Sequence, residues 1–229
     1  MRLLLPFKKQ RLFCGYKVPA YEVNWGYPHY GVDIAARWYD YDATIYASGD
    51  GTVVYSGKDN TLGYAIAVLY KDCENNITGE RHDLIARYMH CEKSYVTTGQ
   101  AVNKNTPLAK EGNYGTKDYH LHFELDTDTK YPLYSPQVSS NHTVWKKGVD
   151  STVNPSEYLW SDEDRINIKP NYNSTYYSEK DYVFPPAGKE ESNNGELMEK
   201  IEQLESENRI LKSKIKLVQD TFAELLESL

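Results

Sequence analysis

Two short segments combine side chains that could bind a metal ion. Residues 29–33 read His-Tyr-Gly-Val-Asp, and residues 120–124 read His-Leu-His-Phe-Glu. Catalytic zinc sites typically take three protein ligands from His, Asp, Glu and Cys and leave one position open for water. His29 and Asp33 could supply two of these ligands, with Gly31 between them to allow a tight path. His122 could supply the third ligand from the distant segment.

Strand geometry would place the polar side chains of the second segment together. Residues 119–125 mix aromatic and aliphatic side chains without Gly or Pro, a pattern that favours a β-strand. Because successive side chains of a strand point to opposite faces, His120, His122 and Glu124 should share one face. The intervening residues should then face an apolar layer: Leu121, Phe123 and Leu125.

A general base would complete a hydrolytic site. Bound zinc lowers the pKa of its water to about 7, so a neighbouring group must accept the proton. Histidine titrates in the useful range. His120 is one candidate, and His90, at the end of the apolar run 84–90, is the other. Glu124 is expected to hydrogen-bond to a histidine rather than to serve as a fourth ligand.

The elements that position these residues are predicted to be β-strands. From Leu3 to about Trp160 the chain shows short β-type runs broken by Gly, Asn and Asp, without a long helical periodicity. This pattern predicts a mainly β, antiparallel domain over residues 1–165. Residues 130–152 form a polar stretch with prolines, which we interpret as a surface insertion near the site. It could contact substrate or simply cover the sheet.

The last part of the chain has a different pattern. Residues 166–194 are rich in Asn, Ser, Tyr and Pro, which is typical of a linker. Residues 195–229 then repeat apolar side chains every seven positions, with a second series interleaved, and predict an α-helical coiled coil. A single amphipathic helix docked on its own domain is the alternative, but the regular five-heptad seam favours the coiled coil. Pairing would make the protein a homo-oligomer or join it to a coiled-coil partner.

Two seam residues bear on the number of strands in this coiled coil. Asn208 at an a position favours two strands, whereas Phe222 at another a position weakens the preference for a dimer over a trimer.

Composition excludes several classes of function. The net charge is −7 and no basic stripe is present, so nucleic-acid binding is not expected. No run reaches the roughly 18 apolar residues of a membrane span. The apolar stretch within residues 1–9 is too short for a signal peptide, so synthesis in the cytoplasm without a leader is expected. Cys14, Cys73 and Cys91 are widely spaced and are expected to be free thiols.

The order of motifs is more specific than any one of them. H-x-G-x-D at 29–33, Tyr-x-His at 88–90, Gly-Asn-Tyr-Gly at 112–115 and H-L-H-F-E at 120–124 follow one another along the chain. From about Leu5 to Trp160 the chain thereby resembles the lysostaphin/LytM-type zinc metallopeptidases, which cut peptide bonds of peptidoglycan. The resemblance implies a compact antiparallel β metallopeptidase domain that binds Zn²⁺. The implied metal ligands are His29, Asp33 and His122, and the implied catalytic histidines are His90 and His120.

The chain departs from the family pattern in three places. A tyrosine before the first ligand often stabilises the oxyanion in these enzymes, and here both Tyr21 and Tyr27 are candidates. Residues 112–119 lack the usual Ser-Thr-Gly run, and the insertion at 130–152 is longer than a minimal member needs. The cleaved bond, which could lie in a cross-bridge or in a stem peptide, therefore stays open.

The resemblance implies a peptidoglycan endopeptidase that acts at the bacterial cell wall. Without a leader, such an enzyme fits a phage or prophage lysin, or a virion-associated wall hydrolase. The alternative is a non-catalytic LytM-like subunit that binds the wall or a partner and is assembled through the coiled coil. That alternative is weighted low because all five site residues are present in this sequence.

Overall fold

A computed structural model describes most of the first 188 residues and ten positions nearer the C-terminus. The described residues are 1–138, 142–169, 174–178, 181, 183–188, 203–204, 207–208, 211–212, 214–216 and 219. The chain divides into two compact units, Met1–Ala187 and Gly188–Leu229. Each unit is considered by itself.

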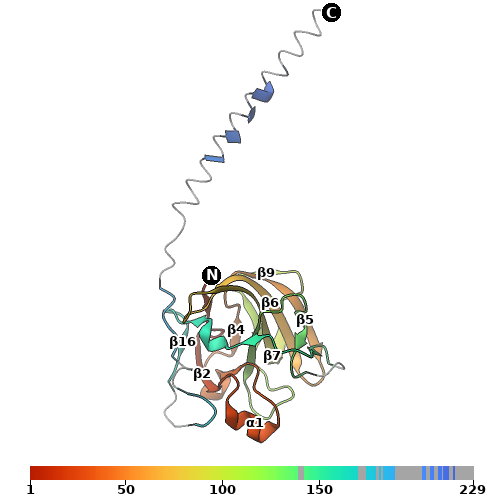
Figure 1. Ribbon diagram of the computed structural model, residues 1–229, viewed down its shortest axis with the longest axis vertical. Coiled ribbons are helices and arrows are strands. Elements are labelled where there is room, and N and C mark those ends of the chain that lie inside the picture. Colours follow the sequence, from red (N-terminus) through yellow and green to blue (C-terminus); the bar gives the residue numbers. More distant parts are fainter. Residues whose placement is uncertain are drawn as a thin grey trace, which may run out of the picture. The chain divides into compact units, whose positions relative to one another are not determined.

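A large, almost wholly antiparallel sheet dominates the first unit (Figure 1). Its strand order is β16-β2-β3-β11-β7-β6-β5-β9, and β14 also pairs with β11. The only parallel pair among these described strands is β16 with β2. The strands are β2 (Lys9–Cys14), β3 (Val32–Ala35), β5 (Gly51–Asp59), β6 (Gly63–Glu74), β7 (Arg81–Cys91), β9 (Ala101–Val102), β11 (Leu121–Asp126), β14 (Thr152–Val153) and β16 (Ile166–Asn167). This architecture confirms the predicted mainly β, antiparallel fold.

Smaller elements cover the large sheet. The remaining strands are β1 (Leu3–Leu4), β4 (Thr44–Tyr46), β8 (Lys93–Ser94), β10 (Pro107–Lys110), β12 (Tyr134–Ser135), β13 (Trp145–Lys146) and β15 (Leu159–Trp160). The helical segments are α1 (Pro19–Trp25) and two 3-10 turns, η1 (Arg37–Tyr39) and η2 (Pro155–Glu157). Strands β4, β10 and β8 form one small sheet, β1 pairs with β15, and β12 pairs with β13.

The β6–β7 hairpin is long. Although residues 71–83 are mostly polar, strand β6 continues to Glu74 and β7 begins at Arg81. The turn is tightened by Asn75, whose side-chain oxygen accepts hydrogen bonds from the backbone N–H groups of Ile77 and Thr78 at 2.9 and 3.0 Å. Such an Asx turn lets a polar segment reverse direction within a few residues.

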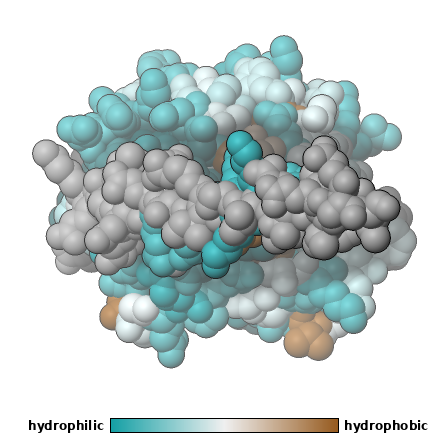
Figure 2. All heavy atoms as spheres, turned by 90° about the horizontal axis from the view of Figure 1, so that it is seen from above, coloured by the Kyte–Doolittle hydropathy of each residue, from teal (hydrophilic) through white to brown (hydrophobic). Residues whose placement is uncertain are grey.

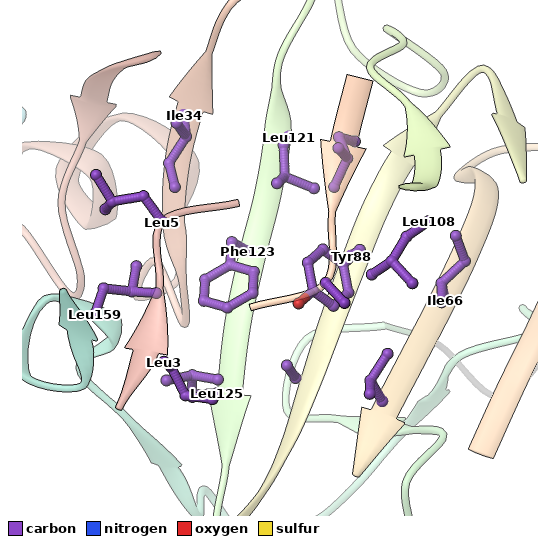
Figure 3. Packing of buried hydrophobic residues seen from close by; sticks show 14 of the residues in the cluster. Leu3, Leu5, Ile34, Ile66, Tyr88, Leu108, Leu121, Phe123, Leu125 and Leu159 are labelled. Atoms are coloured by element: carbon purple, nitrogen blue, oxygen red, sulfur yellow. The ribbon is translucent and has the colours of Figure 1, made fainter. Parts of the chain in front are cut away.

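The apolar face of β11 lies in the main core, as predicted. Leu121, Phe123 and Leu125 are fully buried. The Phe123 ring meets the Tyr88 ring edge-on, with centroids 5.0 Å apart. Figure 3 shows the three β11 side chains among leucines contributed by the chain segments around β1 and β15. Burial of this set on one face leaves the opposite face of β11 available for polar side chains.

The first unit continues beyond the domain end that was expected at residue 165. Arg165 is buried and donates hydrogen bonds to the backbone carbonyls of Leu5 and Ala47 at 2.7 and 2.9 Å. Strand β16 follows at once and pairs with β2. Phe184 and Ala187 are buried as well. Part of the segment expected to be the linker 166–194 is therefore packed onto the domain, because Phe184 and Ala187 find apolar partners there.

The predicted coiled coil lies mostly outside the described residues. The described positions between 203 and 219 are helical and exposed. They include the seam residues Leu204, Leu211 and Ile215, with more than half of each side chain exposed. Pairing of residues 195–229 stays a prediction.

No helix in the described part of the chain is both long and apolar enough to cross a membrane. The face drawn in Figure 2 is mainly hydrophilic, with separate hydrophobic spots.

Candidate metal centre

Neighbouring strands bring the three expected ligands together. Asp33 on β3 and His122 on β11 are directly opposite each other in the antiparallel ladder, so their side chains share a face. His29 lies just before β3. The Asp33 Oδ1 atom is 3.1 Å from His29 Nε2 and 3.0 Å from His122 Nδ1, and the two nitrogens are 3.1 Å apart. All three side chains are buried.

This triangle of donor atoms fits a small divalent ion. Ligands about 2.0–2.2 Å from a tetrahedral zinc ion lie roughly 3–3.5 Å from one another, and two imidazoles with one carboxylate are a common ligand set. Three mutual distances of 3.0–3.1 Å agree with that requirement. The residues present would therefore hold zinc without rearrangement of the strands.

The hydrogen bond of His29 prepares its ring for a metal. Its Nδ1 atom lies 2.8 Å from the backbone carbonyl oxygen of Gly15. Because a carbonyl can only accept, the hydrogen of the neutral ring is on Nδ1, and Nε2 keeps its lone pair. That lone pair points toward Asp33 Oδ1. A fixed tautomer of this kind is typical of metal-binding histidines.

Charges within the centre reinforce one another. Burial alone would raise the pKa of Asp33, but the imidazoles of His29, His120 and His122 outweigh it and hold this pKa well below its usual value. Burial alone would lower the pKa of His122, but its contacts with Asp33 and Glu124 raise this pKa to about 9. Without an ion the carboxylate thus stabilises a proton on His122, and a divalent cation would displace that proton.

Gly31 is required by close packing. A Cβ atom at this position would lie 2.5 Å from the backbone oxygen of Phe123 and 2.8 Å from Nε2 of His122. Gly31 does not have a positive φ. Its role is therefore to let the loop approach the ring of His122, which gives a physical basis to the tight path expected between His29 and Asp33.

The two further histidines lie beside the centre. The His90 and His120 rings have centroids 4.9 Å apart, and His120 Nε2 is 3.7 Å from Asp33 Oδ1. Each ring donates from Nδ1 to a backbone carbonyl, His90 to Tyr114 at 2.7 Å and His120 to Asp118 at 2.9 Å. By the same tautomer argument, Nε2 of each neutral ring is free to accept a proton.

The backbone at His90 is unusual. His90 has φ of 67°, in the left-handed region that few residues other than glycine adopt. The ladder between β6 and β7 is irregular here, because Tyr64 is opposite Cys91 whereas Ile66 is opposite Tyr88. A bulge of this kind re-aims a side chain, and bulges are frequent beside active sites. The bulge explains how a residue at the end of β7 turns its ring toward the metal centre.

Tyr21 lies closer to the centre than Tyr27. The Tyr21 ring stacks on the His29 ring, with centroids 4.4 Å apart, while Tyr27 contacts Tyr21 edge-on at 5.8 Å. Burial, assisted by the negative charge of Asp33, raises the pKa of Tyr21 and keeps its hydroxyl protonated. Between the two tyrosines left open by the sequence, the geometry favours Tyr21.

Glu124 touches the side of His122 that faces away from the triangle. Its Oε2 atom is 3.8 Å from His122 Nε2, whereas Nδ1 of that ring points to Asp33. Glu124 accepts hydrogen bonds from Arg87 Nη1 at 2.7 Å and Ser135 Oγ at 2.9 Å. This geometry agrees with the expectation that Glu124 orients a histidine. Arg87, a charged residue inside the apolar run 84–90, was the overlooked signal for this buried ion pair.

Cys14 is a second residue that sequence reasoning missed. Its Sγ atom and donor atoms of His29 and Asp33 all lie within 4.8 Å of one another. Cys14 is opposite Asp33 in the β2–β3 ladder. It is a free, buried thiol, as Cys73 and Cys91 are. Its pKa is raised, mainly by burial and then by the charge of Asp33, so the thiol is protonated in the metal-free protein.

Comparison with known proteins extends the geometric result. Residues 27–132 match the family model described as Peptidase family M23. The chain is similar to a zinc-containing peptidase of Vibrio cholerae, at 25% identity and TM-score 0.43, over 55% of this chain and only 36% of that one. It is also similar to the catalytic domain of lysostaphin from Staphylococcus simulans, at 23% identity and TM-score 0.39, over 52% of this chain and 81% of that one.

A third similar structure is a prophage-encoded M23 protein, EnpA, of Enterococcus faecalis, at 21% identity and TM-score 0.43, over 65% of this chain and 91% of that one. The similarity to peptidase family M23 rests on the match of residues 27–132, which is less than half of the chain. That segment contains the three members of the donor triangle and both neighbouring histidines. The part of the chain that holds the candidate metal centre is therefore similar to peptidase family M23.

Proposed function

We propose that this protein is a zinc-dependent endopeptidase that hydrolyses peptide bonds of bacterial peptidoglycan. The observation that carries the proposal is the buried triangle of His29 Nε2, Asp33 Oδ1 and His122 Nδ1, with sides of 3.0–3.1 Å. The match to peptidase family M23 supports the reaction class. The resemblance to lysostaphin/LytM-type enzymes supports the wall substrate.

The chain supplies the groups that such a hydrolysis needs. When bound, zinc lowers the pKa of a water molecule and polarises a carbonyl group. Burial, followed by the charges of His120 and His122, lowers the pKa of His90 to about 3, so its ring is neutral. Its Nδ1 is held by the backbone oxygen of Tyr114, so Nε2 is the atom that would take a proton. In its protonated form His120 would donate from Nε2 to developing negative charge. Tyr21, protonated beside His29, is a further donor.

Variants of the centre separate metal binding from catalysis. We expect Asp33→Ala and His122→Ala to lose both bound zinc and cleavage, because each removes a ligand. His90→Ala should retain zinc and lose about 10²–10⁴-fold in turnover, the usual contribution of a general base. The measurements are metal content by mass spectrometry and the release of fragments from purified walls of several chemotypes.

His82→Ala is the matched control. His82 Nδ1 forms a hydrogen bond with the Tyr158 hydroxyl at 2.9 Å and is not part of the metal centre, so this variant should keep zinc and activity. Full cleavage by chelated protein would contradict the proposal. Stoichiometric zinc without release of fragments from any wall would instead favour the non-catalytic alternative, a wall-binding or regulatory subunit.

We also propose that residues 195–229 form a coiled coil, either with a second copy or with another subunit. Such an assembly fits an enzyme concentrated at the wall as a phage lysin or a virion-associated hydrolase, since multivalency raises the effective concentration. Sedimentation equilibrium of the full chain and of residues 1–188 tests the oligomer. A monomeric mass for each of the two proteins, together with no captured coiled-coil partner, would refute it.

A further inference from the structure

The long insertion is fastened to the same face of the sheet as the metal centre. Ser135 donates to Glu124, the carboxylate that lies 3.8 Å from His122 Nε2. Arg87 donates from Nε to the backbone oxygen of Pro132 at 2.9 Å. Lys147 forms an ion pair with buried Asp126. Three polar anchors thus tie the described parts of the insertion to β11 and β7, and the anchored Glu124 is two residues from His122, one of the expected metal ligands.

A small apolar contact confirms which face the insertion covers. Val144 is buried and packs against Ala65 and Met89. Met89 is directly opposite His122 in the β7–β11 ladder, so these two side chains point to the same face. The insertion therefore borders the metal centre on the side of β7.

Three aromatic rings stack on the outer side of this insertion. The rings of Tyr131 and Tyr134 are 5.0 Å apart at 25°, and those of Tyr134 and Trp145 are 6.1 Å apart at 9°. Pairing of β12 with β13 places Tyr134 opposite Trp145 and fixes the stack. The two outer residues are 44% and 45% exposed. The stack thus presents flat, rigid rings to solvent, held at low cost in conformational entropy.

The insertion also differs from the rest of the chain in charge. Residues 130–152 contain three lysines and a single acidic residue, Asp150, in a protein whose net charge is −7. Lys130 lies 5.2 Å from the centre of the Tyr131 ring, and Lys146 is exposed next to Trp145. A flat aromatic surface flanked by cations suits a polymer that combines sugar rings with carboxylates.

We propose that the stack of Tyr131, Tyr134 and Trp145 binds sugar rings of the anionic glycan strand that carries the peptide substrate. The C–H face of a pyranose ring is apolar and weakly positive, and it complements the negative face of an aromatic ring. Lys130 and Lys146 would receive the carboxylates of the strand, whereas Lys147 is already paired with Asp126. The inference rests on the proposed function for the identity of the polymer, while binding can be measured without cleavage.

The experiment measures binding of peptide-free glycan strands prepared from peptidoglycan by amidase treatment. The full-length protein should bind them, and Trp145→Ala should weaken the affinity at least tenfold, while Tyr131→Ala should weaken it less. Tyr95→Ala is a closely matched control. Tyr95 is 43% exposed and has Lys93 5.4 Å from its ring, as Tyr131 has Lys130, but it lies outside the insertion. Its variant should bind like the wild type.

Cleavage kinetics provide a second readout that separates the two proposals. With a disaccharide-bearing peptide, Trp145→Ala should raise KM and leave kcat nearly unchanged, whereas with the same peptide lacking sugar it should change neither. Two results would overturn the glycan-binding inference but not the proposed function. One is cleavage of both substrates by the wild type without glycan binding, and the other is equal effects of Trp145→Ala and Tyr95→Ala. Glycan binding that depends on Trp145 in a protein that cleaves nothing would overturn only the proposed function.

Discussion

The two faces of β11 use the same six-residue strand for opposite purposes. On one face, Leu121, Phe123 and Leu125 are fully buried in the main core. On the other face, His122 and Glu124 are equally shielded from water but are surrounded by hydrogen bonds and charges. Burial of the apolar face stabilises the folded state. Burial of the charged groups on the polar face costs free energy, but it holds them in fixed positions.

This contrast shows how a sheet can hold a buried cluster of charged groups without losing its stability. Buried charge is costly unless it is paired. Every charged side chain on the polar face of β11 has a partner of opposite charge, from Asp33 and Glu124 around His122 to Arg87 and Lys147 around Asp126. Substitutions that act on one face alone test how independent the two faces are.

The largest effect on folding is expected from the apolar face. Phe123→Ala should lower the free energy of unfolding by about 3–5 kcal/mol, because it removes a fully buried ring packed on Tyr88 and leaves a cavity. Urea denaturation of the metal-free protein measures this change. His122→Ala, one position away, should abolish zinc binding but cost less stability, because Asp33 keeps His29 and Glu124 keeps Arg87 as partners. Similar losses of stability in both variants would break the comparison.

The ion pairs of the polar face should give the next largest effect. Arg87→Met leaves Glu124 and Asp126 buried without their shared guanidinium, and we expect a loss of about 3 kcal/mol, at the low end for a broken buried pair because Lys147 still pairs with Asp126. Arg81→Met is the control on the same strand. Arg81 pairs with Asp72 and Glu74 at the surface, so its loss should cost less than about 1 kcal/mol.

A carboxylate without a cation sharpens the comparison further. Among the described residues, Glu111 forms no ion pair; its Oε2 accepts hydrogen bonds from the backbone N–H groups of Ala36 and Arg37 at 3.1 and 2.7 Å. Burial raises the pKa of Glu111 to about 7, against the effect of these hydrogen bonds. The folded state then binds a proton more tightly than the unfolded state, so stability falls as pH rises from about 4.5 to about 7.

Substitution of Glu111 should remove this pH dependence. Glu111→Gln is expected to stabilise the protein by about 1–2 kcal/mol at pH 8 and to flatten the stability profile between pH 4.5 and 7. Thermal unfolding across that window measures the profile. Glu92→Gln, at an exposed site beside Lys110 and Arg37, should leave the fall with rising pH in place. An unchanged profile in Glu111→Gln would show that this carboxyl is not the group responsible.

Much of the centre was predictable because it depends on local periodicity. The alternation of His122 and Glu124 with Leu121 and Phe123 follows directly from strand geometry, and the structure places Asp33 on the adjoining strand and His29 just before it. The β-rich class followed from the same kind of pattern. These features need only the identity of neighbouring residues.

The features that were missed depend on contacts between distant segments. Cys14 approaches the centre only because β2 pairs with β3 in one particular register. The domain extends past residue 165 because Arg165 finds carbonyls of two distant residues. The insertion shows no periodicity that would have revealed the pairing of Tyr134 with Trp145. Register and long-range pairing are not encoded in short sequence windows.

The left-handed backbone at His90 has a consequence for engineering this protein. A glycine there would relieve roughly 1 kcal/mol of strain and would be favoured by any screen that rewards only heat resistance. The same exchange would delete the imidazole that the bulge aims at the centre. Libraries selected for thermal tolerance alone should therefore enrich His90→Gly. On the proposed function this variant would be inactive, so turnover has to be selected at the same time.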